Sequence, residues 1–199
     1  LTYFVNGIRR GDRVTPYSMV SGLGPLGKEG GRLGIIPAEM ADGEILLNAW
    51  TADDLDAKAG DEVTLSYFVL AEGGGLAERT SRFTVRAVVP MERPWADASL
   101  MPEFPGLSDA EDCDDWEPGF DIALKRIRDK DEAYWDEYRG APKAFVTLAA
   151  ARRMWANRFG GLTAVRWSGG EGAAGEIRRD LAERITPGAA GLHFMPVGD

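Results

Sequence analysis

The sequence predicts an α+β protein, in which a mixed β portion is followed by a small α/β portion. Two patterns carry this prediction. Alternating apolar residues in 63–70 and 83–89, with a glycine-rich stretch between them, are typical of a long antiparallel hairpin. The last third of the chain alternates short apolar runs with two segments of helical periodicity, which predicts a β-α-β-α-β sandwich. At 199 residues, the chain is long enough to bury a substantial core.

The N-terminal portion, residues 1–91, is predicted to be mainly β. Before the hairpin, strands are expected at 1–5, 17–21 and 44–48. A glycine-rich loop occupies 22–31, because so many glycines do not hold regular structure. A brief helix is expected after the third strand. Thr51 can cap it, and the helix dipole is stabilised by acidic residues in its first turn.

Residues 92–142 form an acidic insertion that is rich in proline and tryptophan. They contain 15 acidic and 6 basic residues, a surplus that equals the whole net charge of −9. Such a shift in composition is typical of a surface lobe between two ordinary portions. Apolar and aromatic residues at helical spacing predict one helix within it, over 121–138.

The C-terminal portion, residues 143–199, is expected to alternate strands and helices. The predicted strands are 144–147, 162–167 and 192–195. Thr147 can cap the first helix, whose apolar side carries Leu148, Ala151, Trp155 and Phe159. Ile177, Leu181 and Ile185 lie at four-residue steps in the second helix.

The glycines of the loop match two nucleotide-binding patterns. Gly22, Gly24 and Gly27 have the spacing of a dinucleotide fingerprint, and Gly27-Lys28 resembles most of a P-loop. Both patterns need a helix that starts at the last glycine, because its N-terminus holds the phosphate. The sequence continues with Glu29 and two more glycines, which start no helix, so a surface loop is the better interpretation.

Other chemical signals in the sequence are weak. The acidic run at 109–117 lacks the spacing of a calcium loop, so a solvated acidic surface is favoured. The sequence has no Gly-x-Ser-x-Gly motif whose serine His193 could activate. The acidic residues on either side of Cys113 disfavour its thiolate form. We therefore expect no catalytic residue, no cofactor and no metal. A net charge of −9 also argues against a nucleic-acid partner.

Two tryptophans of the insertion allow two interpretations. Trp95 and Trp116 can pin an irregular segment onto the core, or they can anchor a partner protein. In the second case, Asp114, Asp115 and Glu117 would form an acidic rim around Trp116 that suits a basic partner. These five residues are the predicted partner surface.

Segments 45–55, 60–65 and 83–89 resemble the extracytoplasmic core domain of MacB-like and FtsX-like ABC transporter permeases. They contain that family's strand and short helix, its Gly-Asp turn and its Phe-x-Val-x-x-Val return strand. Segments 143–150 and 162–166 resemble the family's second module. The insertion and the glycine loop depart from the family pattern.

The resemblance implies a MacB-like periplasmic core fold and a non-catalytic role. Such a domain lies between two membrane helices, on the extracytoplasmic side of the bacterial inner membrane. It couples ATP hydrolysis by a separate cytoplasmic ATPase to substrate export or to a periplasmic partner, in a homodimeric or heterodimeric transporter. The chain begins at Leu1 and has no apolar run of about 20 residues, so we expect a piece cut from a longer membrane protein. The alternative is a secreted or periplasmic hydrolase, or a carbohydrate-binding domain, that uses the acidic tryptophan-rich lobe.

Overall fold

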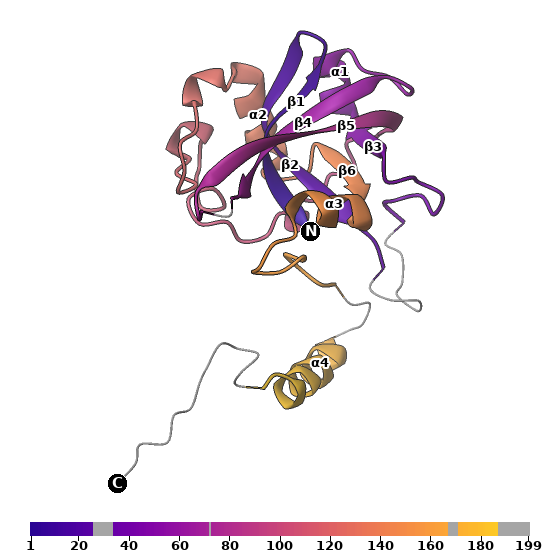
Figure 1. Cartoon of the computed structure of the whole chain (residues 1–199), viewed down its shortest axis with the longest axis vertical. Coiled ribbons are helices and arrows are strands. Elements are labelled where there is room, and N and C mark those ends of the chain that lie inside the picture. Colours follow the sequence, from indigo (N-terminus) through magenta and orange to yellow (C-terminus); the bar gives the residue numbers. More distant parts are fainter. Residues whose placement is uncertain (26–33, 72, 167–170, 187–199) are drawn as a thin grey trace. The chain divides into compact units, whose positions relative to one another are not determined.

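The computed structural model describes residues 1–25, 34–71, 73–166 and 171–186. Its centre is a closed barrel of six strands in the order β1-β2-β6-β3-β5-β4 (Figure 1). The strands are β1 Thr2–Arg10, β2 Arg13–Leu23, β3 Glu44–Asn48, β4 Glu62–Leu70, β5 Leu76–Val89 and β6 Ala144–Thr147. The helices are α1 Ala49–Leu55, α2 Asp129–Tyr138, α3 Leu148–Trp155 and α4 Glu171–Arg184. The barrel belongs to a compact unit, Leu1–Ala164, and α4 belongs to a second unit, Val165–Asp199.

The barrel corrects the predicted α+β fold with its MacB-like sandwich. Strands β4 and β5 do pair antiparallel, with Val63 opposite Phe83, but they are two members of one closed sheet. Strand β6 does not begin a separate β-α-β-α-β unit, because it lies between β2, to which it is parallel, and β3, to which it is antiparallel. The physical reason lies in its sequence: Ala144, Phe145 and Val146 are all buried, and a strand that is apolar on both faces needs cover on both.

The rest of the predicted C-terminal sandwich also differs from the structure. Residues 162–166 form no strand, and the strand predicted at 192–195 lies outside the described residues. Helix α3 ends at Trp155, and a tight turn follows in which Asn157 bridges to Gly160. Phe159 therefore leaves the helix and is 78% exposed, instead of packing on the apolar side of α3. The second predicted helix is present as α4.

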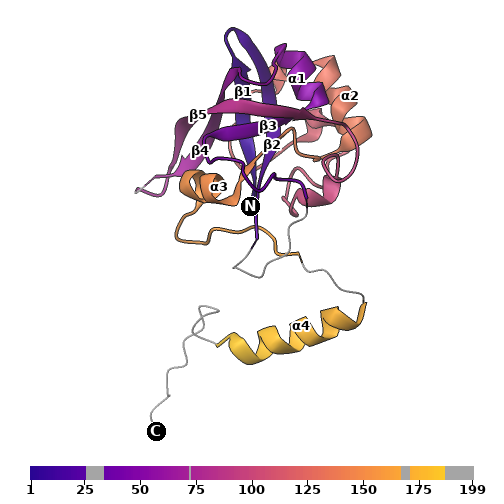
Figure 2. The ribbon, with the colours of Figure 1, turned by 90° about the vertical axis from the view of Figure 1, so that its right-hand side faces the viewer.

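Apolar side chains fill the barrel, and two helices close against it. The central cluster combines strand residues such as Val5, Val20 and Leu65 with Leu55 of α1 and Trp155 of α3. Helices α1 and α3 lie at opposite ends of the barrel in both views (Figures 1 and 2). Helix α1 is capped by Asn48, whose side chain accepts a hydrogen bond from the Thr51 amide, so Thr51 is not the cap that the sequence predicted.

The long connection between β5 and β6, residues 90–143, covers one flank of the barrel and is called the excursion below. It contains the acidic insertion, three short 3₁₀ turns and α2. The predicted helix over 121–138 forms only over its second half, Asp129–Tyr138. The half before it runs over the barrel instead, where Ile122, Leu124 and Ile127 pack against Phe4 and its neighbours. Tertiary packing has thus overridden helical spacing in this segment.

Within the described residues, no helix combines the length and the apolar character that a membrane crossing requires.

The first glycine of the predicted loop, Gly22, is the penultimate residue of β2 and has a packing role. A Cβ placed on Gly22 would lie 2.0 Å from the Cβ of Ala151 in α3. Only a glycine allows this helix to approach the strand so closely. The match of Gly22 to nucleotide-binding patterns is therefore explained by helix–strand packing.

Gly22→Ala is expected to lower the free energy of unfolding by about 1–3 kcal/mol, because the added methyl overpacks the contact with α3. Adding Ala151→Gly should recover much of this loss, since it removes the atom that the methyl meets. Gly43→Ala is the matched control, because its Cβ would meet nothing within 4 Å. Urea denaturation of the native protein and these three variants measures the effect, and equal losses in Gly22→Ala and Gly43→Ala would contradict it.

Candidate functional site

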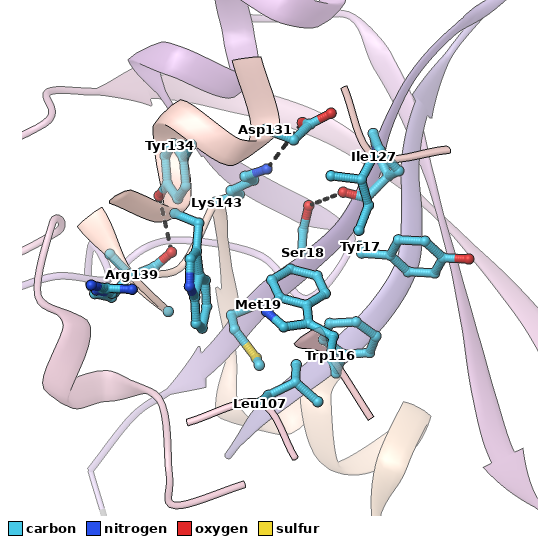
Figure 3. A pocket seen from close by; sticks show the side chains of 15 residues that line it. Tyr17, Ser18, Met19, Leu107, Trp116, Ile127, Asp131, Tyr134, Arg139 and Lys143 are labelled. Carbon is cyan, nitrogen blue, oxygen red and sulfur yellow. Dashed lines mark hydrogen bonds and ion pairs between the residues drawn. The ribbon is translucent and has the colours of Figure 1, made fainter. Parts of the chain in front are cut away.

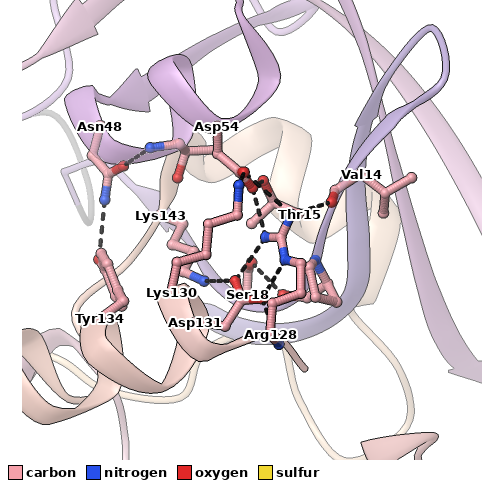
Figure 4. Close-up of polar contacts among 12 residues, drawn as sticks. Val14, Thr15, Ser18, Asn48, Asp54, Arg128, Lys130, Asp131, Tyr134 and Lys143 are labelled. Carbon is pink, nitrogen blue, oxygen red and sulfur yellow. Dashed lines mark hydrogen bonds and ion pairs between the residues drawn. The ribbon is translucent and has the colours of Figure 1, made fainter. Parts of the chain in front are cut away.

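A group of charged side chains lies where the excursion meets the barrel and α1 (Figure 4). We call it the buried ion network after its buried members Asp54, Asp131 and Lys143, and it also contains the partly exposed Arg128 and the exposed Lys130. Helix α1 contributes Asp54, and the segment around α2 contributes Arg128, Lys130 and Asp131. Lys143 comes from the end of the excursion, just before β6. Five residues from three parts of the chain thus meet in one place.

Asp54 receives hydrogen bonds from both sides of the junction. Thr15 on β2 donates its hydroxyl at 2.6 Å, and Arg128 donates Nη2 at 2.7 Å. The ammonium of Lys130 also contacts this carboxylate. Burial alone would raise the pKa of Asp54, but these hydrogen bonds outweigh it and hold the pKa below its ordinary value. Asp54 is therefore an ionised anchor for the excursion.

Arg128 bridges two carboxylates. Besides Asp54, it contacts Asp131 through Nε at 2.6 Å and Nη2 at 2.8 Å, which is a two-pronged pair. It also donates Nη1 to the Val14 carbonyl of β2 at 3.2 Å. Hydrogen bonds to Asp131 raise the pKa of Arg128 further above its ordinary value. One guanidinium thus joins α2, α1 and β2.

Lys143 places a charge in the interior. Its Nζ lies 3.5 Å from Oδ1 of Asp131, and 4.3 Å and 4.6 Å from the ring centroids of Trp50 and Tyr134. Its backbone is fixed as well, because its amide donates to Met19 and its carbonyl accepts from Asn48. Burial lowers the pKa of Lys143 to about 8, although Asp131 opposes the shift.

Tyr134 completes the wall beside Lys143. Its hydroxyl donates to the Ala141 carbonyl at 2.9 Å and accepts from Nδ2 of Asn48 at 3.0 Å. Burial raises the pKa of Tyr134, so the phenol stays neutral. Asn48 also donates to the Pro142 carbonyl. The residue that caps α1 is therefore also tied to Tyr134 of α2 and to Pro142 near the start of β6.

A small cavity adjoins this wall (Figure 3). Its volume of about 20 Å³ is room for about one water molecule. Asp131, Tyr134 and Lys143 line one side, and Trp116 and Met19 line another. A buried lysine with a lowered pKa is the usual starting point for a nucleophile. Here its ammonium is engaged by Asp131 and two rings beside a water-sized space, so the arrangement suits a structural junction better than catalysis.

The predicted partner surface is divided by the structure. Trp116 is 7% exposed and packs with Phe4 and Trp135, so it is a core residue of the excursion and not an accessible anchor. Trp95 is half-buried in a different cluster, where its Nε1 donates to the Ile35 carbonyl at 3.3 Å. The acidic residues beside Trp116 are exposed: Asp114, Asp115 and Glu117. These acids form a charged surface, but the aromatic centre that they were predicted to surround faces inward.

The other sequence candidates are also placed. Cys113 is buried, and burial together with its contact to Glu132 raises the thiol pKa, whereas the sequence attributed the effect to the adjacent acids. In the part of the chain that the structure describes, no three His, Cys, Asp or Glu side chains come together as metal ligands. His193 lies outside the described residues.

The buried ion network is not predicted from the sequence. Two signals were present. Lys143 directly precedes the wholly apolar Ala-Phe-Val of β6, and a lysine inside a buried run requires a partner. Arg128 and Asp131 are three apart at the start of a helix, a spacing at which side chains meet. Neither signal indicates that Asp54, far away in the sequence, is the shared partner.

The variant Lys143→Met tests whether this charge is buried, through the pH dependence of the unfolding free energy. The folded protein releases the Lys143 proton near pH 8, whereas the unfolded chain keeps it to about 10.5. Between these values the unfolded state binds more protons, so this group's contribution to stability rises with pH. We therefore expect the unfolding free energy of the native protein, minus that of Lys143→Met, to increase from pH 8 to pH 10.

Both proteins contain Cys113 and Tyr134, so the titration of these two groups cancels in the difference between the two unfolding free energies. Denaturant melts at half-unit pH intervals measure it. A difference that stays flat from pH 8 to pH 10 would show that Lys143 titrates normally in the folded protein.

Comparison of the sequence with protein-family models and with curated proteins finds no match.

Proposed function

We propose that the chain is a non-catalytic extracytoplasmic domain of an ABC transporter permease. In this role it couples ATP hydrolysis by a separate cytoplasmic ATPase to substrate export or to a periplasmic partner. Part of the support is the sequence resemblance, whose segments are neighbours in space. The segments 45–55, 83–89 and 143–150 contain most of β3, the second half of β5 and all of β6, and β3 pairs with both of the others. These three segments therefore form one connected part of the barrel, whereas the resembling segment 162–166 forms no strand.

The buried ion network is the observation that carries the proposal. Coupling needs a domain that moves as one body when the membrane helices move. Here the longest connection of the barrel unit is fastened to α1 by Arg128, which lies between Asp54 of α1 and Asp131 of α2. The geometry thus favours transmission of movement over turnover of a substrate.

The partners follow from the same proposal. They are the membrane helices of the permease, its ATPase and a second permease subunit, and a periplasmic protein is the candidate external partner. The domain would lie on the extracytoplasmic side of the inner membrane. The rival interpretation, a carbohydrate-binding or hydrolytic lobe, needs accessible tryptophans. The two tryptophans at the centre of the lobe, Trp116 and Trp135, are buried, so the rival gains no support from them.

Labelling the full-length parent protein in intact bacterial cells tests the proposal. Asp136→Cys places a thiol on the exposed side of α2, whereas the native Cys113 is buried and serves as the internal control. After the outer membrane is permeabilised, a membrane-impermeant maleimide should label Asp136→Cys and leave the native protein unlabelled. The labelled protein should also purify together with an ATPase subunit. Labelling only after the inner membrane is broken, or purification without an ATPase, would overturn the proposal.

A further inference from the structure

One face of the barrel unit differs in charge from the rest of this acidic protein. Between Glu137 and Glu171 the sequence contains no Asp or Glu, but it contains six basic residues. Three of these, together with two exposed apolar residues, belong to α3 and the loop after it. We call them the basic face: Arg152, Arg153, Arg158, Phe159 and Leu162.

Local contacts fix the basic face at the end of the barrel where the chain begins. The amide of Thr2 donates to the hydroxyl of Thr163 at 2.9 Å, which ties the loop to the start of β1. Arg152 donates Nε to the Gly161 carbonyl at 3.4 Å, which ties the loop to α3. In both views, α3, this loop and Leu1 lie at the same end of the barrel (Figures 1 and 2).

The side chains of this face are exposed and combine positive charge with apolar surface. Phe159 is 78% exposed and Leu162 is 37% exposed. The guanidinium of Arg158 lies 4.9 Å from the ring centroid of Phe159, so charge and aromatic surface are presented together. Arg153 is paired with Asp42 at 2.6 Å, which leaves Arg152 and Arg158 as the main source of positive charge. Arginines beside exposed aromatic and aliphatic side chains are typical of protein surfaces that bind at a lipid headgroup layer.

We propose that the basic face binds the anionic headgroups of a phospholipid bilayer. The inference rests on the proposed function, in which the domain is attached to membrane helices, and it places this end of the barrel against the bilayer. Guanidinium groups suit the phosphates of headgroups, with which they form paired hydrogen bonds. Phe159 and Leu162 would enter the interfacial layer between them. Contact with the membrane would give the domain a second attachment in addition to its covalent link. Movement of the membrane helices would then be transmitted to the barrel.

Vesicle flotation with the 199-residue chain tests this binding. The chain should float with vesicles of phosphatidylglycerol and phosphatidylcholine, and should stay behind with vesicles of phosphatidylcholine alone. Each arginine near an anionic surface raises the binding affinity by about fivefold, so the loss of two arginines lowers it by about 25-fold. The pair Arg152→Gln and Arg158→Gln should therefore weaken binding by about that factor, and added salt should weaken it further. Phe159→Ala should weaken binding at constant charge.

Arg79→Gln with Arg82→Gln is the matched control, because it removes the same charge from exposed positions on β5. If the control pair loses as much affinity, the binding comes from the charge of the whole chain and the proposal is wrong. If the native chain does not float with phosphatidylglycerol vesicles, the proposal is also wrong, and the basic face serves a protein contact instead. The result is separable from the labelling experiment. External labelling without vesicle binding refutes only the lipid contact, whereas internal labelling refutes the proposed function.

Discussion

Asp131→Ala is expected to lower the free energy of unfolding by about 3–5 kcal/mol, one of the two largest losses that we predict for a single substitution. Asp131 is 6% exposed and is the carboxylate that faces both Arg128 and Lys143. Its removal leaves the ammonium of Lys143 buried without a counter-charge. The lysine must then lose its proton or draw water into the junction, and either change costs free energy.

Two further variants make this prediction specific. Asp136→Ala removes a carboxylate from an exposed position of α2 and is expected to change the unfolding free energy by less than about 0.5 kcal/mol. Combining Asp131→Ala with Lys143→Met removes both members of the pair and should recover a large part of the loss. Urea denaturation at pH 7 measures all four proteins. A double variant as unstable as Asp131→Ala would show that the loss comes from elsewhere, such as the start of α2.

Local patterns in this sequence predict elements better than they predict how the elements meet. The alternation in Val63–Val69 and Phe83–Val89 predicted two strands and their antiparallel pairing, which the structure contains. It could not predict that β4 also pairs with β1, where Ile8 lies opposite Leu65 and closes the barrel. Closure depends on contacts between residues more than fifty positions apart, and no periodicity within one segment reports such contacts.

The candidate site illustrates the same limit. The charge count of 92–142 marks a segment that lies within the excursion, and its acids Asp114, Asp115 and Glu117 are exposed. The acids with structural roles have the same appearance in the sequence as those without. Asp54 and Asp131 differ from their exposed neighbours only in meeting Arg128 and Lys143. Burial of an ionised group is a property of the tertiary structure.

Trp116→Ala is expected to lower the free energy of unfolding by about 3–5 kcal/mol, because it removes a large buried ring and leaves a cavity. Its ring packs edge-on against Trp135 at 5.0 Å and against Phe4 of β1 at 5.9 Å between centroids. These contacts join α2 to the outside of the barrel, so their loss should loosen the excursion. For a chain of this size the melting temperature should fall by about 6–20 °C.

Two comparisons separate this packing role from the alternative of a partner anchor. Trp116→Phe keeps an aromatic ring in place and should lose less stability than Trp116→Ala. Phe159→Ala removes an aromatic ring that is 78% exposed and should leave the melting temperature nearly unchanged. Thermal melts followed by near-ultraviolet circular dichroism report both stability and the environment of the tryptophans. If Trp116→Ala melts with the native protein, the ring contributes nothing to the core, and the partner surface predicted around Asp114, Asp115 and Glu117 regains its aromatic centre.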